Sequence, residues 1–405
     1  MKLRKSVRLI VIALLLGAIL LPATAQTVRL RLATTTSTQD SGLLPVLNHA
    51  LVPLRAAAKA AVFLLKVYPM LPSRPVDWVT KTPLVEKVSY PSRSGLVEGE
   101  IYRPPDAGPH PAVVVCLGVV PFGVDHPQVP VLGKALARAG IVALLYWSPN
   151  MRDFRLDPED VESIALAYRW LIDQPYVDPA RSGLIGTCVG GSFALMAAAS
   201  TLIRDRVRFI FTYAPFSSMW TFARDIASAT RTTANGREAW KVDPLTRKVF
   251  VHSVTAALEP GEAQQLWAAF EEGRGPLDPT SLSPDGQAVC ALLAGIDADK
   301  AEDALHRLPL PMQARLDALS PLNYLKDVRA PLIIQLHDVG DGVIPVSESR
   351  RLHAALAGRA GAHYTEMQFQ HLDPEKAKLP LPRLLGELGK VFQAVLLIFR
   401  QTVDA

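Results

Sequence analysis

The segment that decides the fold is "LIGTCVGGSFALMAAAS", residues 184–200. Its first residues are typical of a short buried strand, and its last ten are mostly small or apolar, as in a buried helix. Between them, Gly186, Gly190 and Gly191 surround Cys188. Glycine permits sharp turns and close backbone approach. The pattern therefore predicts a strand–turn–helix unit that presents the Cys188 thiol at the end of a sheet, and it raises the question of whether that thiol is a nucleophile.

The composition is that of a globular enzyme-sized chain. Its 405 residues are 49% hydrophobic and 20% charged, enough for one large domain with additions. The net charge is +5, but the basic residues are scattered, so we expect no nucleic-acid partner. Three cysteines are too few for a disulfide framework. The His and Cys spacings fit no zinc pattern and no phosphate-binding glycine loop is present, so we expect neither metal nor cofactor.

The N-terminus has the pattern of a targeting segment. "MKLRKSVR" is basic, residues 9–21 are apolar, and Ala23-Thr24-Ala25 offers a cleavage site, which predicts a signal peptide over residues 1–25. The apolar run is shorter than the ~20 residues of a membrane span, so cleavage is favoured over anchoring. The body is then exported, to the periplasm or outside the cell, or anchored. An oxidising compartment counts against an active thiol.

Residues 26–82 are expected to form an N-terminal extension. In "VRLRLATTTSTQDSGLLPVL", residues 28–47, hydroxyl side chains precede a helix start, which suits an oxyanion. This stretch resembles the opening strand and loop of the tungstate-binding periplasmic protein family. Nothing later continues that pattern, so we expect a fragment without tungstate binding.

Residues 48–75 are mostly apolar, and Arg55, Lys59 and Lys66 recur near helical spacing. Such a helix can lie on a membrane surface, or it can pack on the domain that follows. The sequence leaves both open, and a membrane-surface association through residues 1–75 is one expectation.

The organised domain is expected to begin near residue 83. Residues 84–105 alternate about a Ser-Gly turn and predict a hairpin. Further strands are predicted at 111–118, 141–147, 182–186, 207–215, 330–338 and 364–369. Helices are predicted at 128–139, from 157, after the Cys188 turn, at 345–358 and at 383–400. Strands that alternate with helices predict a parallel, doubly wound sheet, built from residues 83–215 and 326–405.

Residues 216–325 interrupt this alternation and are expected to be a largely helical lid over the carboxyl ends of the strands, where ligands bind. The segment carries five large aromatic side chains: Trp220, Phe222, Trp240, Trp267 and Phe270. The alternative is that these aromatics form only a small core of their own.

The partners that a nucleophile needs follow in the order nucleophile, acid, histidine. Asp341 lies in a turn after a predicted buried strand, and His371 follows the last predicted strand. The Val189 N–H, at the start of a helix, would be one oxyanion donor. The same helix end, with a nearby imidazole, would lower the pKa of Cys188.

Residues 84–400 resemble the α/β-hydrolase superfamily, and the Gly-x-Cys-x-Gly-Gly turn is similar to that of the dienelactone hydrolase family. The resemblance implies an α/β-hydrolase fold with a doubly wound, mostly parallel sheet. It makes Cys188 the nucleophile, His371 the general base and Asp341 the group that orients the imidazole. It places the second oxyanion donor in residues 117–123, at Val119 or alternatively at Val120.

The chain departs from that family at several points: Leu117-Gly118 and His337-Asp338 stand where the family has His-Gly, and Gln370 stands where it has Gly. These departures bear on the substrate more than on the fold.

Several alternatives stay open at the site. Asp338 and Asp373 compete with Asp341, and His353 and His363 compete with His371. Asp125-His126 could touch substrate or form a loop pair. Cys116 is expected in the core, but a disulfide with Cys188 would silence an enzyme.

The sequence predicts a hydrolase of carboxylic esters, lactones or thioesters that acts on a small molecule through a Cys-His-Asp triad. The alternative is a catalytically silent member of the fold, in which Cys188 is an inert buried thiol and the chain is a binding or scaffold protein. A third class, an oxyanion-binding protein, depends on residues 34–42 alone.

Overall fold

The computed structural model describes residues 43–403, apart from 69–70, 72, 121–125, 234, 272–276 and 370–378. Several predictions fall outside the described residues. They concern the signal peptide, residues 28–42 of the stretch compared with tungstate-binding proteins, and the side chains of Asp125, His371 and Asp373. None of the described helices is both long and apolar enough to cross a bilayer.

The described strands of the main sheet number eight and lie in the order β1-β2-β4-β3-β5-β6-β9-β10. β1 pairs antiparallel with β2, β2 pairs antiparallel with β4, and the remaining pairs are parallel. A separate antiparallel pair is formed by β7 and β8. The strands are β1 Leu84–Ser92, β2 Gly95–Arg103, β3 Ala112–Cys116, β4 Val142–Tyr146, β5 Gly183–Thr187, β6 Phe209–Tyr213, β7 Thr230–Thr233, β8 Gly236–Ala239, β9 Leu332–Asp338 and β10 Ala362–Met367.

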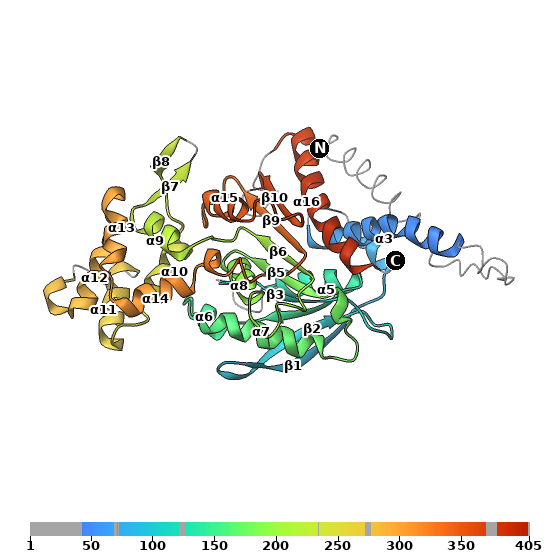
Figure 1. Ribbon diagram of the computed structural model, residues 1–405, viewed down its shortest axis with the longest axis horizontal. Coiled ribbons are helices and arrows are strands. Elements are labelled where there is room, and N and C mark those ends of the chain that lie inside the picture. Colours follow the sequence, from blue (N-terminus) through green and yellow to red (C-terminus); the bar gives the residue numbers. More distant parts are fainter. Residues whose placement is uncertain are drawn as a thin grey trace.

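Helices cover both faces of the sheet (Figure 1). They are α3 Leu43–Val67, α4 Arg74–Val79, α5 Gln128–Arg138, α6 Pro149–Arg152, α7 Glu159–Ile172, α8 Val189–Ala197, α9 Met219–Ala227, α10 Pro244–Val254, α11 Pro260–Phe270, α12 Pro284–Leu293, α13 Ala298–His306, α14 Leu310–Ala318, α15 Val346–Ala355 and α16 Leu381–Thr402. α7, α8 and α15 contribute to the apolar cluster on one face, and α3, α5 and α16 to the cluster on the other. The prediction of a doubly wound, mostly parallel sheet is confirmed.

The central strands are continuous apolar runs because both of their faces are buried. In β3, Val114 and Cys116 join the cluster on the α7 and α8 face, while Val113 and Val115 join the cluster on the α5 face. All five β3 residues are buried. This is the expected pattern of a parallel strand between two helical layers.

Helix α3 packs on the domain. It contacts α16 and α5, and its side chains Ala56, Ala60 and Leu65 are buried. Asp77 of α4 forms salt bridges with Lys66 of α3 at 2.7 Å and with Arg138 of α5 at 2.9 Å. The basic side chain of Lys66 therefore ties α3 to α4. Association of residues 1–75 with a membrane surface stays a prediction.

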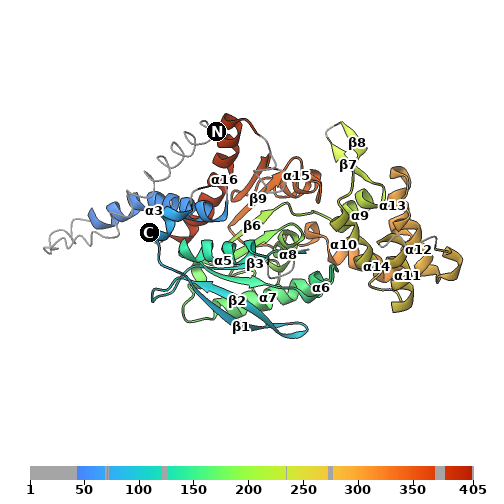
Figure 2. The same ribbon diagram turned by 180° about the vertical axis from the view of Figure 1, so that it is seen from behind.

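The segment between β6 and β9 carries α9 to α14 and the β7–β8 pair, and we call it the helical insertion. It forms a lobe beyond one end of the sheet (Figure 2). Phe222 and Trp240 belong to the same apolar cluster as α7 and α8, and the other three aromatics pack against it. The aromatics therefore extend the main core instead of forming only a separate one. Its role as a lid stays a prediction.

A buried carboxylate connects the base of the helical insertion to α15. Glu348 has no exposed surface and accepts hydrogen bonds from the N–H of Ser217 at 2.8 Å and the hydroxyl of Thr221 at 2.9 Å. Arg351, one turn further along α15, also pairs with Glu348. The first turn of the insertion is thereby held to the core.

Candidate active site

Cys188 lies in the turn between β5 and α8 with φ +54° and ψ −135°. Its N–H donates to the carbonyl of Tyr213 in β6 at 2.7 Å, and its own carbonyl accepts from Gly191 at 2.9 Å. A positive φ in a non-glycine residue is strained, and such residues concentrate at functional sites. The turn is the predicted strand–turn–helix unit.

The glycines around Cys188 are required by backbone contacts. A Cβ atom on Gly190 would lie 2.2 Å from the carbonyl oxygen of Cys116, and one on Gly186 would lie 2.5 Å from the carbonyl oxygen of Gly190. Any larger residue would push α8 away from β3 and β5. The sequence pattern thus follows from how closely α8 approaches the sheet.

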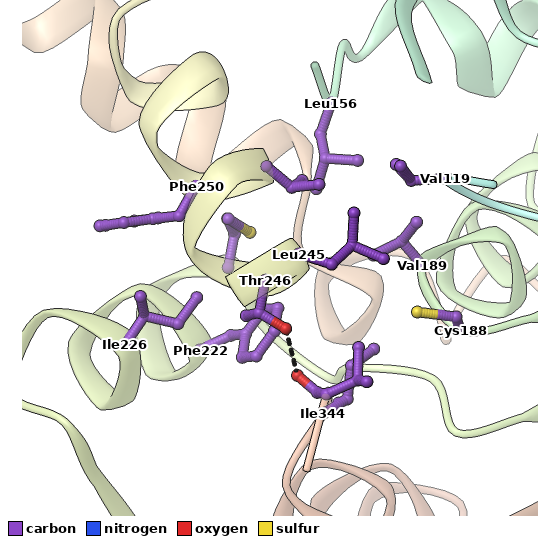
Figure 3. Close-up of a pocket in the computed structure, with 13 residues that line it drawn as sticks. Val119, Leu156, Cys188, Val189, Phe222, Ile226, Leu245, Thr246, Phe250 and Ile344 are labelled. Atoms are coloured by element: carbon purple, nitrogen blue, oxygen red, sulfur yellow. Dashed lines mark hydrogen bonds between the residues drawn. The ribbon is translucent and has the colours of Figure 1, made fainter. Parts of the chain in front are cut away.

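Cys188 faces a cavity with about 400 Å³ of unoccupied space, a figure that includes the part open to solvent (Figure 3). Cys188 and Val189 lie on one side of it, and Phe250 and Ile226 lie across from them. The Thr246 hydroxyl is engaged, because it donates to the carbonyl of Val343 at 2.9 Å. The lining residues are Val119, Leu156, Cys188, Val189, Met219, Phe222, Ile226, Leu245, Thr246, Val249, Phe250, Val343 and Ile344. The cavity therefore offers a ligand mainly apolar contact.

The two predicted oxyanion donors belong to residues that line the same cavity as Cys188. Val119 follows Gly118, which has φ +75°, and both Val119 and Val189 line the cavity. Among the described residues, neither of their N–H groups has a backbone acceptor outside regular helices and strands. The alternative donor, Val120, packs against the apolar cluster on the opposite face of the sheet. The geometry thus favours Val119 over Val120.

The Cys188 thiol is in an environment that disfavours its charged form. The pKa of Cys188 is raised to about 12, first by burial and then by the charges of Asp341 and Asp243, while the Val189 N–H acts to lower it. The sequence-based expectation of a lowered pKa is therefore wrong for the environment that the described residues provide. The helix end acts in the expected direction, but loss of hydration outweighs it.

Asp341 is buried in the turn after β9, with 1% of its surface exposed. Its Oδ1 accepts from the N–H groups of Val343 at 2.7 Å and Ile344 at 3.1 Å. Its Oδ2 lies 3.7 Å from Nε2 of His337. Two backbone donors fix this carboxylate in place, and its charge acts on Cys188.

The competing acids and bases occupy other positions. Asp338 accepts from the N–H of Gly340 at 2.7 Å and from that of Phe369, so it fixes the loops after β9 and β10. His353 is exposed and stacks on Tyr364 with ring centroids 5.0 Å apart, and His363 is exposed in β10. Because His371 lies outside the described residues, its place in the site stays a prediction.

Two further alternatives concerned the cysteines: Cys116 as a core residue, and a disulfide between Cys116 and Cys188. Cys116 is buried in β3, and Cys116 and Cys188 are both free thiols. The structure contains no disulfide between them.

The far wall of the cavity is formed by residues that the sequence does not assign to the site. Met219, Phe222 and Ile226 come from α9, and Leu245 and Val249 come from α10. The apolar spacing of residues 245, 249 and 250 was an available signal for α10, but nothing in it says that this face meets Cys188.

No family model matches the chain. Two curated human proteins match a part of it: acyl-coenzyme A thioesterase 1 and acyl-coenzyme A thioesterase 2, mitochondrial, each 30% identical over 114 residues. The matched part is 27% of this chain and 25% and 22% of those proteins, respectively. The chain thus spans about a quarter of the length of the curated relatives that it matches.

Solved structures resemble most of the chain at low sequence identity. The uncomplexed acylaminoacyl peptidase of Pyrococcus horikoshii is 15% identical with a TM-score of 0.48, covering 81% of this chain and 44% of that one. The α/β hydrolase GrgF from Penicillium sp. sh18 is 18% identical with a TM-score of 0.45, covering 77% and 99%.

The strand order, the helices on both faces and the turn after the central strand β5 define the class. This chain has the strand order and the doubly wound, mostly parallel sheet of the α/β-hydrolase fold, as the sequence predicts. At the position of this fold that presents a nucleophile, it carries the thiol of Cys188.

Proposed function

We propose that this chain hydrolyses carboxylic esters or thioesters that have an apolar acyl group, with Cys188 as the nucleophile. The observation that carries the proposal is the position of Cys188. Its turn, with a positive φ, presents the thiol to an apolar cavity that Val119 and Val189 also line.

In the first step, the Cys188 sulfur attacks the carbonyl carbon and a C–S bond forms. The carbonyl electron pair moves to oxygen, where the two N–H groups stabilise the negative charge. His371 takes the thiol proton and gives it to the leaving alcohol or thiol as the scissile bond breaks. Water then attacks the acyl-enzyme, releasing the acid and restoring the thiol. Asp341 orients the imidazole.

The raised pKa of Cys188 favours proton removal during attack over a preformed thiolate. A thiol with a pKa of about 12 is almost entirely neutral at neutral pH. The reaction therefore needs a general base at the moment of attack, as for a serine nucleophile.

The substrate class follows from the cavity and from the relatives. The apolar lining fits a hydrocarbon acyl group. The local similarity to two acyl-coenzyme A thioesterases supports thioesters. The Gly-x-Cys-x-Gly-Gly turn, similar to that of dienelactone hydrolases, keeps lactones in the class. We also propose that residues 1–25 act as a signal peptide that directs export of the chain.

A second candidate is a silent member of the fold that binds an apolar ligand without cleaving it. The raised pKa of the half-buried thiol favours it, because the thiol is neutral at neutral pH. Intact mass after mixing the reduced protein with p-nitrophenyl butyrate separates the two. We expect an acyl adduct that decays with release of butyrate, lost in Cys188→Ala and kept in Cys290→Ala, which removes a buried thiol in α12. A folded, reduced protein without adduct and without ester loss would leave the silent candidate.

A further inference from the structure

A second cavity lies inside the helical insertion, next to the first. It lies between the end of α10 and α14 and has about 390 Å³ of unoccupied space, a figure that includes the part open to solvent. Val254, Met312 and Leu316 are among its lining residues. Within the part of the chain that the structure describes, Met219 is the one residue that lines both cavities.

The two cavities follow one another along α10. Thr246 and Phe250 line the first cavity, and Val254, one turn beyond Phe250, lines the second. A helix rises 1.5 Å per residue, so Thr246 and Val254 are separated by roughly 12 Å along the helix axis. A ligand that follows this face of α10 away from Cys188 would reach the second cavity.

The polar side chains of the second cavity are engaged with the wall of the first. Ser253 accepts a hydrogen bond from the N–H of Leu156 at 3.0 Å, and Arg315 donates to the carbonyl of Leu156 at 3.1 Å and to Asp157 at 3.2 Å. Leu156 itself lines the first cavity. The second cavity therefore offers a ligand mainly aliphatic and methionine surface.

We infer that Met219 is the partition of one extended acyl-binding channel, and that acyl chains too long for the first cavity displace its side chain and continue into the second. Met219 is 2% exposed, and it sits at the first position of α9. A methionine side chain has three rotatable bonds and adapts to what packs against it. The inference deepens the proposed function: the preferred substrates are esters or thioesters of long-chain fatty acids.

Burial of each additional methylene strengthens binding about fourfold. If only the first cavity takes the chain, this gain stops when that cavity is full. If Met219 gives way, the gain continues as the chain enters the second cavity. The dependence of affinity on chain length thus distinguishes the two cases.

Calorimetry of saturated fatty acids from butyrate to palmitate tests the channel without needing turnover, and kcat/KM for the matching p-nitrophenyl esters tests it during reaction. We expect affinity to keep rising beyond octanoate. Val254→Phe fills the second cavity and should lower palmitate affinity at least tenfold more than octanoate affinity. Ala257→Trp, at an exposed lining residue that tolerates bulk, should act in the same direction. Met219→Ala removes the partition and should raise the ratio of palmitate to octanoate affinity.

Leu310→Trp is the matched control, because Leu310 is 79% exposed on α14 and lies outside both cavities. It should leave the chain-length dependence as in the parent. Equal palmitate affinity in the parent, Val254→Phe and Ala257→Trp would overturn the channel, as would no gain beyond octanoate. If affinity rises with chain length but no ester is hydrolysed, the proposed function is refuted and the channel stands. If esters are hydrolysed but the dependence on chain length is the same in the parent, Val254→Phe and Ala257→Trp, the channel is refuted and the proposed function stands.

Discussion

Replacing Asp341 by Asn should make Cys188 faster to alkylate and slower to turn over esters. The Asp341 charge is, after burial, the largest influence that raises the pKa of Cys188. Removing this charge should make the thiol more acidic and faster to alkylate. Because Asp341 also orients the proposed base, ester turnover should fall.

The magnitudes follow from the pKa of Cys188. With a pKa of about 12, roughly 10⁻⁴ of the thiol is ionised at pH 8, against roughly 10⁻¹ for a thiol at the ordinary value of 9.0. Iodoacetamide should therefore modify Cys188 about a thousandfold more slowly in the folded protein than in guanidinium. Loss of one neighbouring charge is worth about one pKa unit, so Asp341→Asn should react roughly tenfold faster than the parent. Turnover should fall by about 10³–10⁴.

The assay is peptide-resolved mass spectrometry of iodoacetamide labelling between pH 6 and 10, which separates Cys188 from Cys116 and Cys290. Asp243→Asn is the control, since Asp243 is a smaller influence in the same direction and an Asn side chain can still cap α10. It should accelerate labelling less and change turnover by no more than a few-fold. A labelling plateau below pH 7 in the parent, or slower labelling in Asp341→Asn, would refute the reasoning.

Three further predictions concern stability. Leu65→Ala should cost about 3 kcal/mol in urea unfolding, because Leu65 is buried where α3 packs on the domain; a loss below about 0.5 kcal/mol would mean that α3 is dispensable. Glu348→Gln should cost about 3 kcal/mol by the same measurement, since it removes the charge from a fully buried carboxylate bonded to the insertion; an unchanged midpoint would contradict this. The raised pKa of Cys188 means that the folded state keeps the proton that the unfolded chain releases above pH 9. The parent should therefore lose about 2 kcal/mol more than Cys188→Ala between pH 9 and pH 10.5, with stability full below pH 9; equal losses would refute it.

The sheet was predictable because its strands are buried on both faces. Runs such as residues 111–118 have no polar side to confuse with a surface, and the structure places β3 within that run. In α7, the residues at helical spacing Ile164, Tyr168 and Leu171 are likewise fully buried, and Val161 on the same face is partly buried. Segments with only one buried face were less determined. The sequence left α3 between a membrane surface and the domain, because an apolar stripe has the same spacing against either.

The site was predictable where backbone geometry restricts the residue type. The glycines of the Cys188 turn predict the close approach of α8 to Cys116. The turn after a buried strand predicts the position of Asp341, whose role as the orienting acid stays a prediction. The cavity wall and the direction of the Cys188 pKa were not predictable. Both depend on how residues from α9 and α10 pack over the thiol, and no local pattern encodes that contact.

The Cys188 turn has a consequence for when the proposed activity would appear during folding. Gly190 abuts the backbone of Cys116 in β3, and the Cys188 N–H bonds to Tyr213 in β6, so the turn is held by two strands that are separated from it in sequence. Such non-local contacts form late, after loop-closure entropy has been overcome. A refolding intermediate with helices and local hairpins in place would therefore lack the thiol geometry. Recovery of hydrolysis after dilution from denaturant should lag behind recovery of helical circular dichroism, reporting completion of the central sheet.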